Sequence, residues 1–589
     1  MAEPTINLGN GNWAGKTDNL LGYYKEGERF YKQDFTFSRS TTGTYTDKKG
    51  YIQEMPYNKL QQSNSFDTTW SNVSSTETSN QSGHDGTSNA WLLTATAAGG
   101  RLDQSISLSG IQCISVYAKA NTFDYLFLLG LGASDRRGNF DLTNGVVATT
   151  QNLIDSSIES IGDGWYRCSI TYNDTISAVR VYGLQGDNDF TGTSGSIYIQ
   201  DAQLVKGTSA KTYFPTTTRL NMPRVDYLNN SNGSLILEPQ STNTVTYSED
   251  FSQWGNARTT DTANQITSPD GLNNGTLLEQ QSGQTNAGSI FKSVALSSGT
   301  YAQSVFAKKK DKDFIVCYSA NAERTYFNLS NGTIGTIASG NTAKIEDYGN
   351  GWYRCTITYT ITSGGVIAFY LSDSDNSSVV TDSGGVYIYG AQLEAGSYST
   401  TLINTSGSSV TRNQDACSMT NVADRIGQTE GTLYSEFDLT EDSSFTIIEI
   451  NLGNSTNNRI LAYRNASYIA FVVQVGGVIE INDSTLVTFL ETNKVAVTYK
   501  TDEFQIYLNG SSIKTYTSGS IPSGFDTIDL QDNNLQGKKQ SIKDLKVYDT
   551  ALSDTELATL TGGTSTVYNW VDSSSNKIIN ENGDTIIFT

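Results

Sequence analysis

The chain has 589 residues, too many for one hydrophobic core, which indicates about three or four domains. Only 17% of the residues are charged and only 7 are proline, whereas Gly (54), Tyr (33) and Phe (22) are frequent, which favours short strands joined by polar turns over long helices. The net charge of −21 argues against nucleic-acid binding, which depends on Lys and Arg to neutralise phosphates.

The N-terminal part begins with a polar, aromatic-rich lead, residues 1–34, which we expect to be a docking segment. Residues 35–60 are expected to form a strand, a turn and a second strand. We predict no signal peptide and no membrane insertion, because there is no charged start followed by an apolar run and no stretch of about 18 apolar residues. The five cysteines follow no disulfide or zinc spacing, so we expect folding in a reducing cytoplasm.

A duplicated domain follows. Residues 161–172 (IGDGWYRCSITY) return as residues 348–359 (YGNGWYRCTITY), and two further pairs of segments recur at nearly the same spacing. The offset, 352 − 165 = 187 residues, indicates two copies of a whole domain rather than a short repeat. We place the copies at 61–218 and 246–406, and the run of short strands in each predicts an antiparallel sandwich.

The rest of the chain reads as strands, apart from one helix. Residues 219–245 form an expected strand pair that, together with 35–60, makes a β connector split by the first copy. A linker at 407–427 precedes strand-like runs in 428–562, and a capping box at 553–556 predicts a short helix that ends near Gly562. Residues 563–589 are expected to form a terminal hairpin. The predicted fold class is all-β: three tandem antiparallel β-sandwich (jelly-roll) domains, a small β connector and one short helix near the C-terminus.

Each copy offers an aromatic ring beside an arginine. Trp165 with Arg167, and Trp352 with Arg354, lie on one face of a predicted strand. Sugar binding uses such rings for the apolar side of a pyranose and such donors for its hydroxyls, so these four residues are glycan-binding candidates. The alternative is structural: each Trp packs under a loop and each Arg pairs with an acid. Recurrence in both copies fits either interpretation.

Matching loops of the two copies are rich in aspartate. Asp187 and Asp189 correspond to Asp373 and Asp375. Calcium prefers such oxygen ligands, so a structural calcium is a candidate cofactor, although Asp and Asn also favour turns. The single histidine, His84, which a Ser-His-Asp triad would need, is expected to be an exposed turn residue. No catalytic residue is predicted, and we expect a non-enzymatic protein.

The two copies resemble the carbohydrate-binding-module-like jelly rolls of bacteriophage head and tail fibre proteins. The likeness depends on residues 242–254, on the Gly-Trp-Tyr-Arg strand, and on the Ala-Gln-Leu-Glu sequence at 391–394. Residues 431–437 and 542–557 are similar to a concanavalin-like, laminin-G-like sandwich.

This resemblance implies a phage virion surface protein, a fibre or spike, that presents glycan-binding sandwiches for host attachment and gains strength from several copies. The implied partners are other virion proteins and host-surface glycans, in a homo-oligomer that is a trimer by analogy. The implied location is the virion surface, after synthesis in the host cytoplasm. The alternatives are a purely structural decoration or fibre-connector protein, a polysaccharide depolymerase, and a bacterial cell-surface adhesin.

Overall fold

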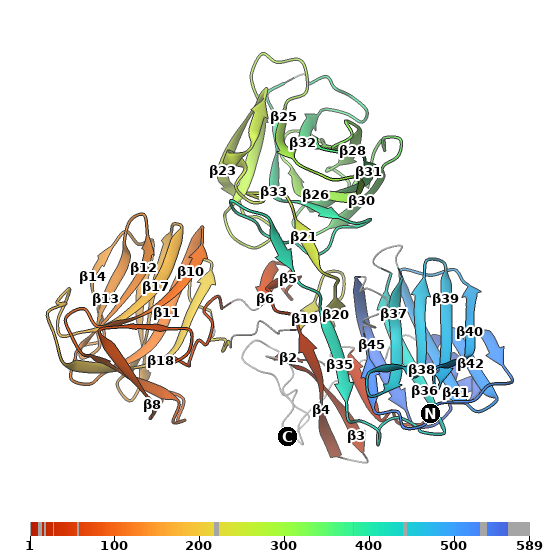
Figure 1. Ribbon diagram of the computed structural model, residues 1–589. Helices are drawn as coiled ribbons and strands as arrows, with labels where there is room; N and C mark the ends of the chain where they lie inside the picture. The colour runs from red at the N-terminus through yellow and green to blue at the C-terminus, as the bar shows by residue number, and fades with distance from the viewer. Residues whose placement is uncertain are drawn as a thin grey trace, which may run out of the picture. The chain divides into compact units, whose positions relative to one another are not determined.

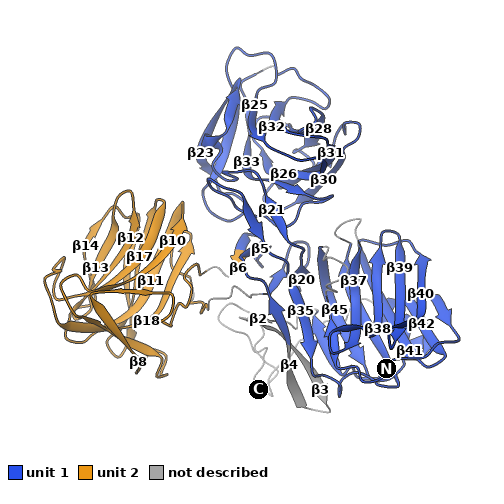
Figure 2. Cartoon of the chain, in the orientation of Figure 1, with its two compact units in different colours: residues 1–53, 221–589 blue, residues 54–220 orange. Residues whose placement is uncertain are grey.

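A computed structural model describes residues 2–9, 14–16, 19–26, 29–55, 58–211, 213–216, 223–380, 382–439, 444–530 and 539–562, with the backbone alone between residues 14 and 34. It confirms the predicted all-β fold, and α1 (Asp554–Gly562) is the single α-helix of the described residues (Figure 1). The predicted terminal hairpin, residues 563–589, lies outside the described residues. The chain divides into two compact units: Glu54–Leu220, and Met1–Gln53 together with Asn221–Thr589 (Figure 2). The first unit is therefore inserted into the sequence of the second.

The inserted unit, here the first jelly roll, is a sandwich of two six-stranded sheets. One sheet has the order β14 (Val146–Gln151), β13 (Arg136–Asp141), β12 (Tyr125–Gly132), β17 (Ile176–Leu184), β10 (Arg101–Leu108), β7 (Ser71–Val73). The other has the order β15 (Asp155–Gly162), β16 (Trp165–Asn173), β11 (Ile111–Ala120), β18 (Gly195–Lys206), β9 (Ala90–Ala95), β8 (Ser75–Gln81). Alternate residues of β11 and β16, such as Val116 and Ile170, fill the core, as the period of two along a strand requires.

The second jelly roll repeats this architecture strand for strand. One sheet has the order β22 (Gly255–Ala257), β25 (Ser289–Val294), β32 (Gly365–Ser372), β27 (Phe314–Tyr318), β28 (Arg324–Asn328), β29 (Thr333–Ile334). The other has the order β23 (Thr259–Ile266), β24 (Gly275–Gln280), β33 (Gly385–Ala395), β26 (Gly299–Lys309), β31 (Trp352–Ile361), β30 (Thr342–Asp347). Even the β-bulge recurs, in β18 opposite Val116 of β11 and in β33 opposite Val305 of β26, so the whole sandwich is duplicated.

The C-terminal part forms a third sandwich. One sheet runs β43 (Ser511–Tyr516), β42 (Glu503–Leu508), β41 (Thr492–Lys500), β36 (Glu430–Asp438), β45 (Gln540–Tyr548), and β45 also pairs with β1 (Ile6–Gly9) and β20 (Ser234–Leu237). The other runs β40 (Val478–Leu486), β39 (Tyr468–Val475), β38 (Ser455–Asn465), β37 (Phe445–Leu452), β44 (Thr527–Asp529), β35 (Ala416–Thr420), β4 (Arg29–Ser38).

Three segments distant in sequence complete this third core. The same apolar cluster that holds the β36 and β45 side chains also contains Ile6, Leu8, Phe35, Phe37, Leu235 and Leu237. Strand β1 belongs to the predicted docking segment 1–34, so part of that segment lies within the C-terminal sandwich. Two further strands continue the sheet beyond β4: β3 (Asn19–Glu26) pairs with β4, and β2 (Ala14–Lys16) pairs with β3. The remaining strands form short pairs. These are β5 (Gly43–Thr46) with β6 (Ile52–Met55), β19 (Arg224–Asp226) with β20, and β21 (Ser241–Asn243) with β34 (Val410–Arg412).

Five buried charged side chains form a cluster where the connector strands meet the linker. This charge cluster consists of Arg39, Arg224, Glu238, Arg412 and Asp415, each no more than 1% exposed. Asp415 accepts hydrogen bonds from Arg39 at 2.8 Å and from Arg224 at 2.6 Å. Glu238 accepts from Arg224 at 2.8 Å and also from Arg412. Charges this deep are stable only when paired, so each member depends on the others.

The cluster also reaches the second jelly roll and keeps its carboxylates ionised. Thr401, which follows β33, donates its N–H and its hydroxyl to Glu238 at 2.8 and 2.7 Å. Burial alone would raise the pKa of Glu238, but Arg412 and Arg224 outweigh burial and hold that pKa well below its usual range. Arg224 and Arg39 lower the pKa of Asp415 against burial in the same way.

We expect the free energy of unfolding to fall as the pH drops below about 4, the ordinary pKa of Asp and Glu. A carboxylate whose pKa is lowered by folding stabilises the fold above its unfolded pKa, and this contribution is lost as the pH falls toward the folded pKa. Glu238 and Asp415 act in this way, whereas Asp226 and Asp544, whose pKa burial raises, oppose the trend. Guanidinium titrations between about pH 7 and about pH 3 test this, and Asp415→Asn should flatten the decline; an unchanged slope would contradict it.

Helix α1 begins where the capping box predicted. The backbone N–H and the hydroxyl of Ser553 both donate to the Glu556 carboxylate, at 3.0 and 2.8 Å. Leu557 is buried in a small apolar cluster with Tyr434 and Tyr548 of the C-terminal sandwich, which holds the helix against the sheet. Among the described residues, no helix combines the length and the apolar character needed to cross a bilayer.

Candidate functional site

The predicted pair in the second jelly roll lies inside the protein. Trp352 is 2% exposed, and its indole N–H donates to the Thr267 carbonyl at 3.1 Å. It belongs to an apolar cluster that includes Ile52 of β6, so the β5–β6 hairpin covers this face of the sheet. Arg354, 1% exposed, donates to the Thr400 carbonyl at 2.7 Å. Neither side chain presents the exposed ring or donor that the sequence suggested, because the outer face of the strand is buried as well as the inner one.

The matching pair in the first jelly roll is also engaged within the protein. Trp165 is 3% exposed. Arg167 is half-buried, lies 5.3 Å from the ring centre of Tyr117, and donates to the Gln203 side chain at 3.2 Å and to the Lys211 carbonyl. A pyranose therefore has no open indole face at either tryptophan. Both tryptophans are thus packed within the protein, as the structural alternative predicted. The two arginines differ from that alternative, because they donate to neutral oxygens rather than to carboxylates.

His84 differs from the exposed turn residue that was predicted. Its ring stacks on Tyr117 at 4.0 Å between centroids, with 10° between the planes, and Nε2 lies 2.9 Å from the Asp201 carboxylate. Asp201 sits at the β-bulge with φ of 56°, and burial raises the pKa of its carboxyl. This His–Asp pair fixes the loop between β8 and β9 on the sheet, and no described serine completes a triad with it in the hydrogen bonds of the structure.

The four aspartates proposed for calcium do not converge. Asp187 accepts from the Thr149 hydroxyl at 2.5 Å, Asp189 from Thr191, and Asp375 from the backbone of Thr336 at 2.7 Å, contacts that order loops. Asp373 forms an ion pair with Lys312, which also pairs with Asp382. Calcium needs about six to eight oxygen ligands, and at Asp373 a lysine ammonium already supplies the cation. Within the described ranges, no group of three or more His, Cys, Asp or Glu side chains is placed to hold a metal ion.

The outer face of the other sheet in the second jelly roll carries a different set of side chains. Ile315, Cys317, Phe327, Ile367 and Phe369 point into the core, so their neighbours along each strand point outward. The register then aligns two rows across β25, β32, β27 and β28, namely Phe291, Ala368, Tyr318, Arg324 and Ser289, Tyr370, Val316, Tyr326.

Arg324, at the end of the first row, lies close to two tyrosines. The Arg324 guanidinium carbon lies 4.8 Å from the ring centre of Tyr370 and 5.9 Å from that of Tyr318. The two tyrosine rings are 5.5 Å apart, with 57° between their planes. All three side chains are half-buried, so their outer surfaces reach solvent. We call Tyr318, Arg324 and Tyr370 the tyrosine–arginine face; it combines aromatic surface and a planar donor, the groups that sugar recognition requires.

The first jelly roll places related residues at the same positions. Arg137 stands opposite Leu129 and corresponds to Arg324, and Tyr182 corresponds to Tyr370, since 324 − 137 = 187 and 370 − 182 = 188. The two positions are thus duplicated, but the contact is not: the guanidinium over Tyr182 is that of Arg101, 5.6 Å from the ring centre.

The two copies differ in how far this face is covered. In the first jelly roll, Phe190 from the loop after β17 packs on Tyr182 and Phe127, with ring centres 5.5 and 5.1 Å away, and Tyr182 is only 6% exposed. No described aromatic ring covers Tyr370 in this way; its ring contacts are those with Tyr318 and Arg324. The second jelly roll is therefore the better candidate for binding.

The sequence contained a signal for this face. Strands 314–318 and 365–372 alternate between apolar and aromatic or small residues, and Arg324 opens the next strand. The repeated tryptophan motif directed the prediction to a face of the sheet where both tryptophans are buried, because alternation defines two faces of a strand without telling which one another element covers.

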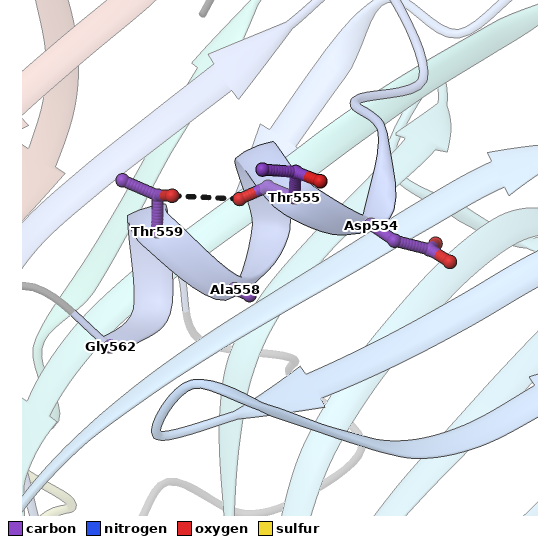
Figure 3. A pocket seen from close by; sticks show the side chains of 5 residues that line it. All are labelled: Asp554, Thr555, Ala558, Thr559 and Gly562. Carbon is purple, nitrogen blue, oxygen red and sulfur yellow. Dashed lines mark hydrogen bonds between the residues drawn. The ribbon is translucent and has the colours of Figure 1, made fainter.

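A hollow beside α1 is a concave feature of the described surface. Asp554, Thr555, Ala558, Thr559 and Gly562 line it, and Thr559 donates to the Thr555 carbonyl at 2.7 Å within the helix (Figure 3). It holds a single ionisable side chain and no ring, so it offers little for specific recognition.

Comparisons with known proteins identify the type of the C-terminal sandwich. No protein of curated function matches the chain. One similar solved structure is the CBM40 of Ruminococcus gnavus IT-sialidase bound to α2,3-sialyllactose, with 18% identity and a TM-score of 0.21 over 23% of this chain and 84% of that chain. A Limulus polyphemus pentraxin has 17% identity and a TM-score of 0.20 over 23% of this chain and 70% of that chain. The Streptococcus pneumoniae NanB sialidase has 16% identity and a TM-score of 0.22 over 26% of this chain and 28% of that chain. Residues 411–558 match the family model of the concanavalin A-like lectin/glucanases superfamily, which confirms the concanavalin-like nature predicted for this region.

Proposed function

We propose that this chain is a non-enzymatic glycan-binding protein of a bacteriophage virion, a fibre or spike whose β-sandwiches contact the host surface. The lectin-type family match in the C-terminal sandwich and the duplicated jelly rolls support carbohydrate binding. The sequence resemblance to phage fibre proteins supports the virion location and, with it, a homo-oligomer. Single sugar contacts are weak, so repeated display on one particle would supply the avidity that attachment needs.

One observation carries the proposal: the tyrosine–arginine face of the second jelly roll. Tyr318 and Tyr370 present aromatic surface beside a guanidinium on an outward face. This arrangement suits the apolar face and the hydroxyl edge of a pyranose.

Tyr370→Ala is expected to weaken glycan binding about fivefold or more, since loss of a central aromatic contact typically costs more than about 1 kcal/mol. The measurement is a glycan array with the intact chain, followed by titration of each bound glycan. Tyr468→Ala is the matched control, because Tyr468 is 40% exposed on the C-terminal sandwich and should leave binding unchanged. Equal loss in both variants, or none in Tyr370→Ala, contradicts the assignment to this face.

A depolymerase would cleave the polysaccharide that it binds, whereas the proposed glycan-binding protein would leave it intact. Incubation of a bound polysaccharide with the protein should release no new reducing ends. Their appearance would replace the proposal with a hydrolase, since glycoside cleavage by two carboxylates needs no cofactor.

The second candidate function is a structural connector or capsid decoration. The buried charge cluster favours it, because it ties the second jelly roll to the C-terminal sandwich through Arg224, Glu238 and Thr401. An intact, folded protein that binds no glycan when displayed at high density would support the connector function instead.

A further inference from the structure

Two described arginines of this acidic chain lack the hydrogen-bonded or carboxylate partners that many of its other described arginines have. Sixty acidic residues face 39 basic ones, and arginines such as Arg101, Arg136 and Arg180 lie within 4.0 Å of a carboxylate. No described carboxylate lies that close to Arg137 or Arg324, and neither guanidinium donates a hydrogen bond to a described protein group. Because acidic residues are in excess, most arginines would be expected to find a carboxylate, so the two that do not are candidates for binding an acceptor from another molecule.

Their positions are equivalent and face the same kind of surface. Arg137 and Arg324 occupy the same place in β13 and β28 of the duplicated sheet. The Nε of Arg137 is buried without a hydrogen-bond partner, as is the Nε of several other described arginines, so the inference depends on the surroundings of Arg324. Arg324 is stacked on Tyr318 and Tyr370, which occupies the flat face of the guanidinium and leaves its N–H edge to an outside acceptor.

We infer that Arg324 binds the carboxylate of an acidic sugar whose ring rests on Tyr318 and Tyr370. This inference rests on the proposed glycan-binding function and specifies its ligand class. A planar guanidinium matches a carboxylate through two parallel hydrogen bonds, a geometry that a neutral hydroxyl cannot reproduce. The chain as a whole repels anions, so attraction requires a local, unneutralised cation, and Arg324 supplies it.

The ligand class is a pyranose with a ring carboxylate, of which uronic acids and sialic acids are the two sources. The test therefore uses two matched pairs: a polyuronate with its carboxyl-reduced form, and a sialylated oligosaccharide with its asialo form. The intact chain should bind at least one acidic member about tenfold more tightly than its neutral partner, and the preference should weaken as salt concentration rises. Which pair shows the preference identifies the source.

Variants of Arg324 test its role. Arg324→Gln should remove the preference for the acidic member. Arg324→Lys should retain only part of the preference, because an ammonium cannot donate the two parallel hydrogen bonds that a guanidinium gives to a carboxylate. Lys500→Gln removes one exposed positive charge from the C-terminal sandwich and controls for net charge, so it should keep the full preference. Thermal unfolding of each variant verifies that it is folded.

The outcomes separate the two claims. Binding of neutral and acidic members alike, or a preference that survives Arg324→Gln, overturns the acidic-sugar inference and leaves the glycan-binding proposal standing. Binding of no glycan at all overturns both.

Discussion

Asp415→Asn is expected to lower the free energy of unfolding of the unit that contains the charge cluster by about 3–5 kcal/mol, because removal of one partner leaves buried charges uncompensated. Asp415 accepts from Arg39, from Arg224 and from the backbone N–H of Glu238 at 2.8 Å. An amide cannot neutralise the two guanidinium groups. Burial already lowers the pKa of Arg39 to about 10, so this arginine has the most to lose.

Guanidinium unfolding of the intact chain measures the effect, with Glu503→Gln as the control. Glu503 and Lys500 are paired at 3.8 Å on the surface, with more than half of each side chain exposed, and such a pair contributes at most about 1 kcal/mol. If Asp415→Asn were no more destabilising than this control, the cluster would be hydrated rather than dry. The two units of the chain unfold separately in principle, so the transition of the first jelly roll should not move.

Trp352→Ala is expected to cost about 3–5 kcal/mol, the usual range for removal of a buried tryptophan from a packed core. The indole fills the space between the outer face of β31 and the β5–β6 hairpin, in contact with a cluster that includes Phe306, Tyr389 and Leu402. Its loss opens a cavity and removes the hydrogen bond to Thr267. Denaturant unfolding measures the change, and faster proteolysis within residues 43–55 would show that the hairpin has loosened.

Glycan binding by the same variant separates a structural from a binding role. Below its unfolding transition, Trp352→Ala should bind glycans as the parent chain does, because the tyrosine–arginine face lies on the other sheet. An unchanged unfolding curve with lost binding would reverse this and make Trp352 a sugar contact. Trp254, 6% exposed in the same sandwich, serves as a second buried tryptophan for comparison.

The duplicated sandwiches, the helix and its cap could be predicted because they depend on local patterns. The alternation in residues 165–172 predicted a strand, and the structure has β16 there. The spacing of Ser553 and Glu556 predicted a helix cap, and the two residues are hydrogen-bonded. The repeat was visible because the two copies retain the same strand order and bulge.

The completion of the third core and the position of the binding face could not be predicted in this way. Ile6 and Leu237 are buried beside β45, more than 300 residues away, and no local pattern indicates such a pairing. Trp352 is buried from outside by Ile52, a residue of a hairpin 352 − 52 = 300 positions earlier. Alternation predicted two faces for its strand, but only tertiary contact decides which face remains open.

Strand β1 pairs with β45, and the start of β45 lies 540 − 9 = 531 positions after the end of β1. At the usual pace of translation, roughly half a minute to two minutes pass before the ribosome has delivered the partner strand. During that interval Ile6 and Leu8 have no sheet to join, whereas each jelly roll has all its own strands as soon as it emerges. The sandwich completed after both jelly rolls thus takes up a strand made before either of them, and a ribosome that stalls before residue 540 would leave this apolar strand open to aggregation or to a chaperone.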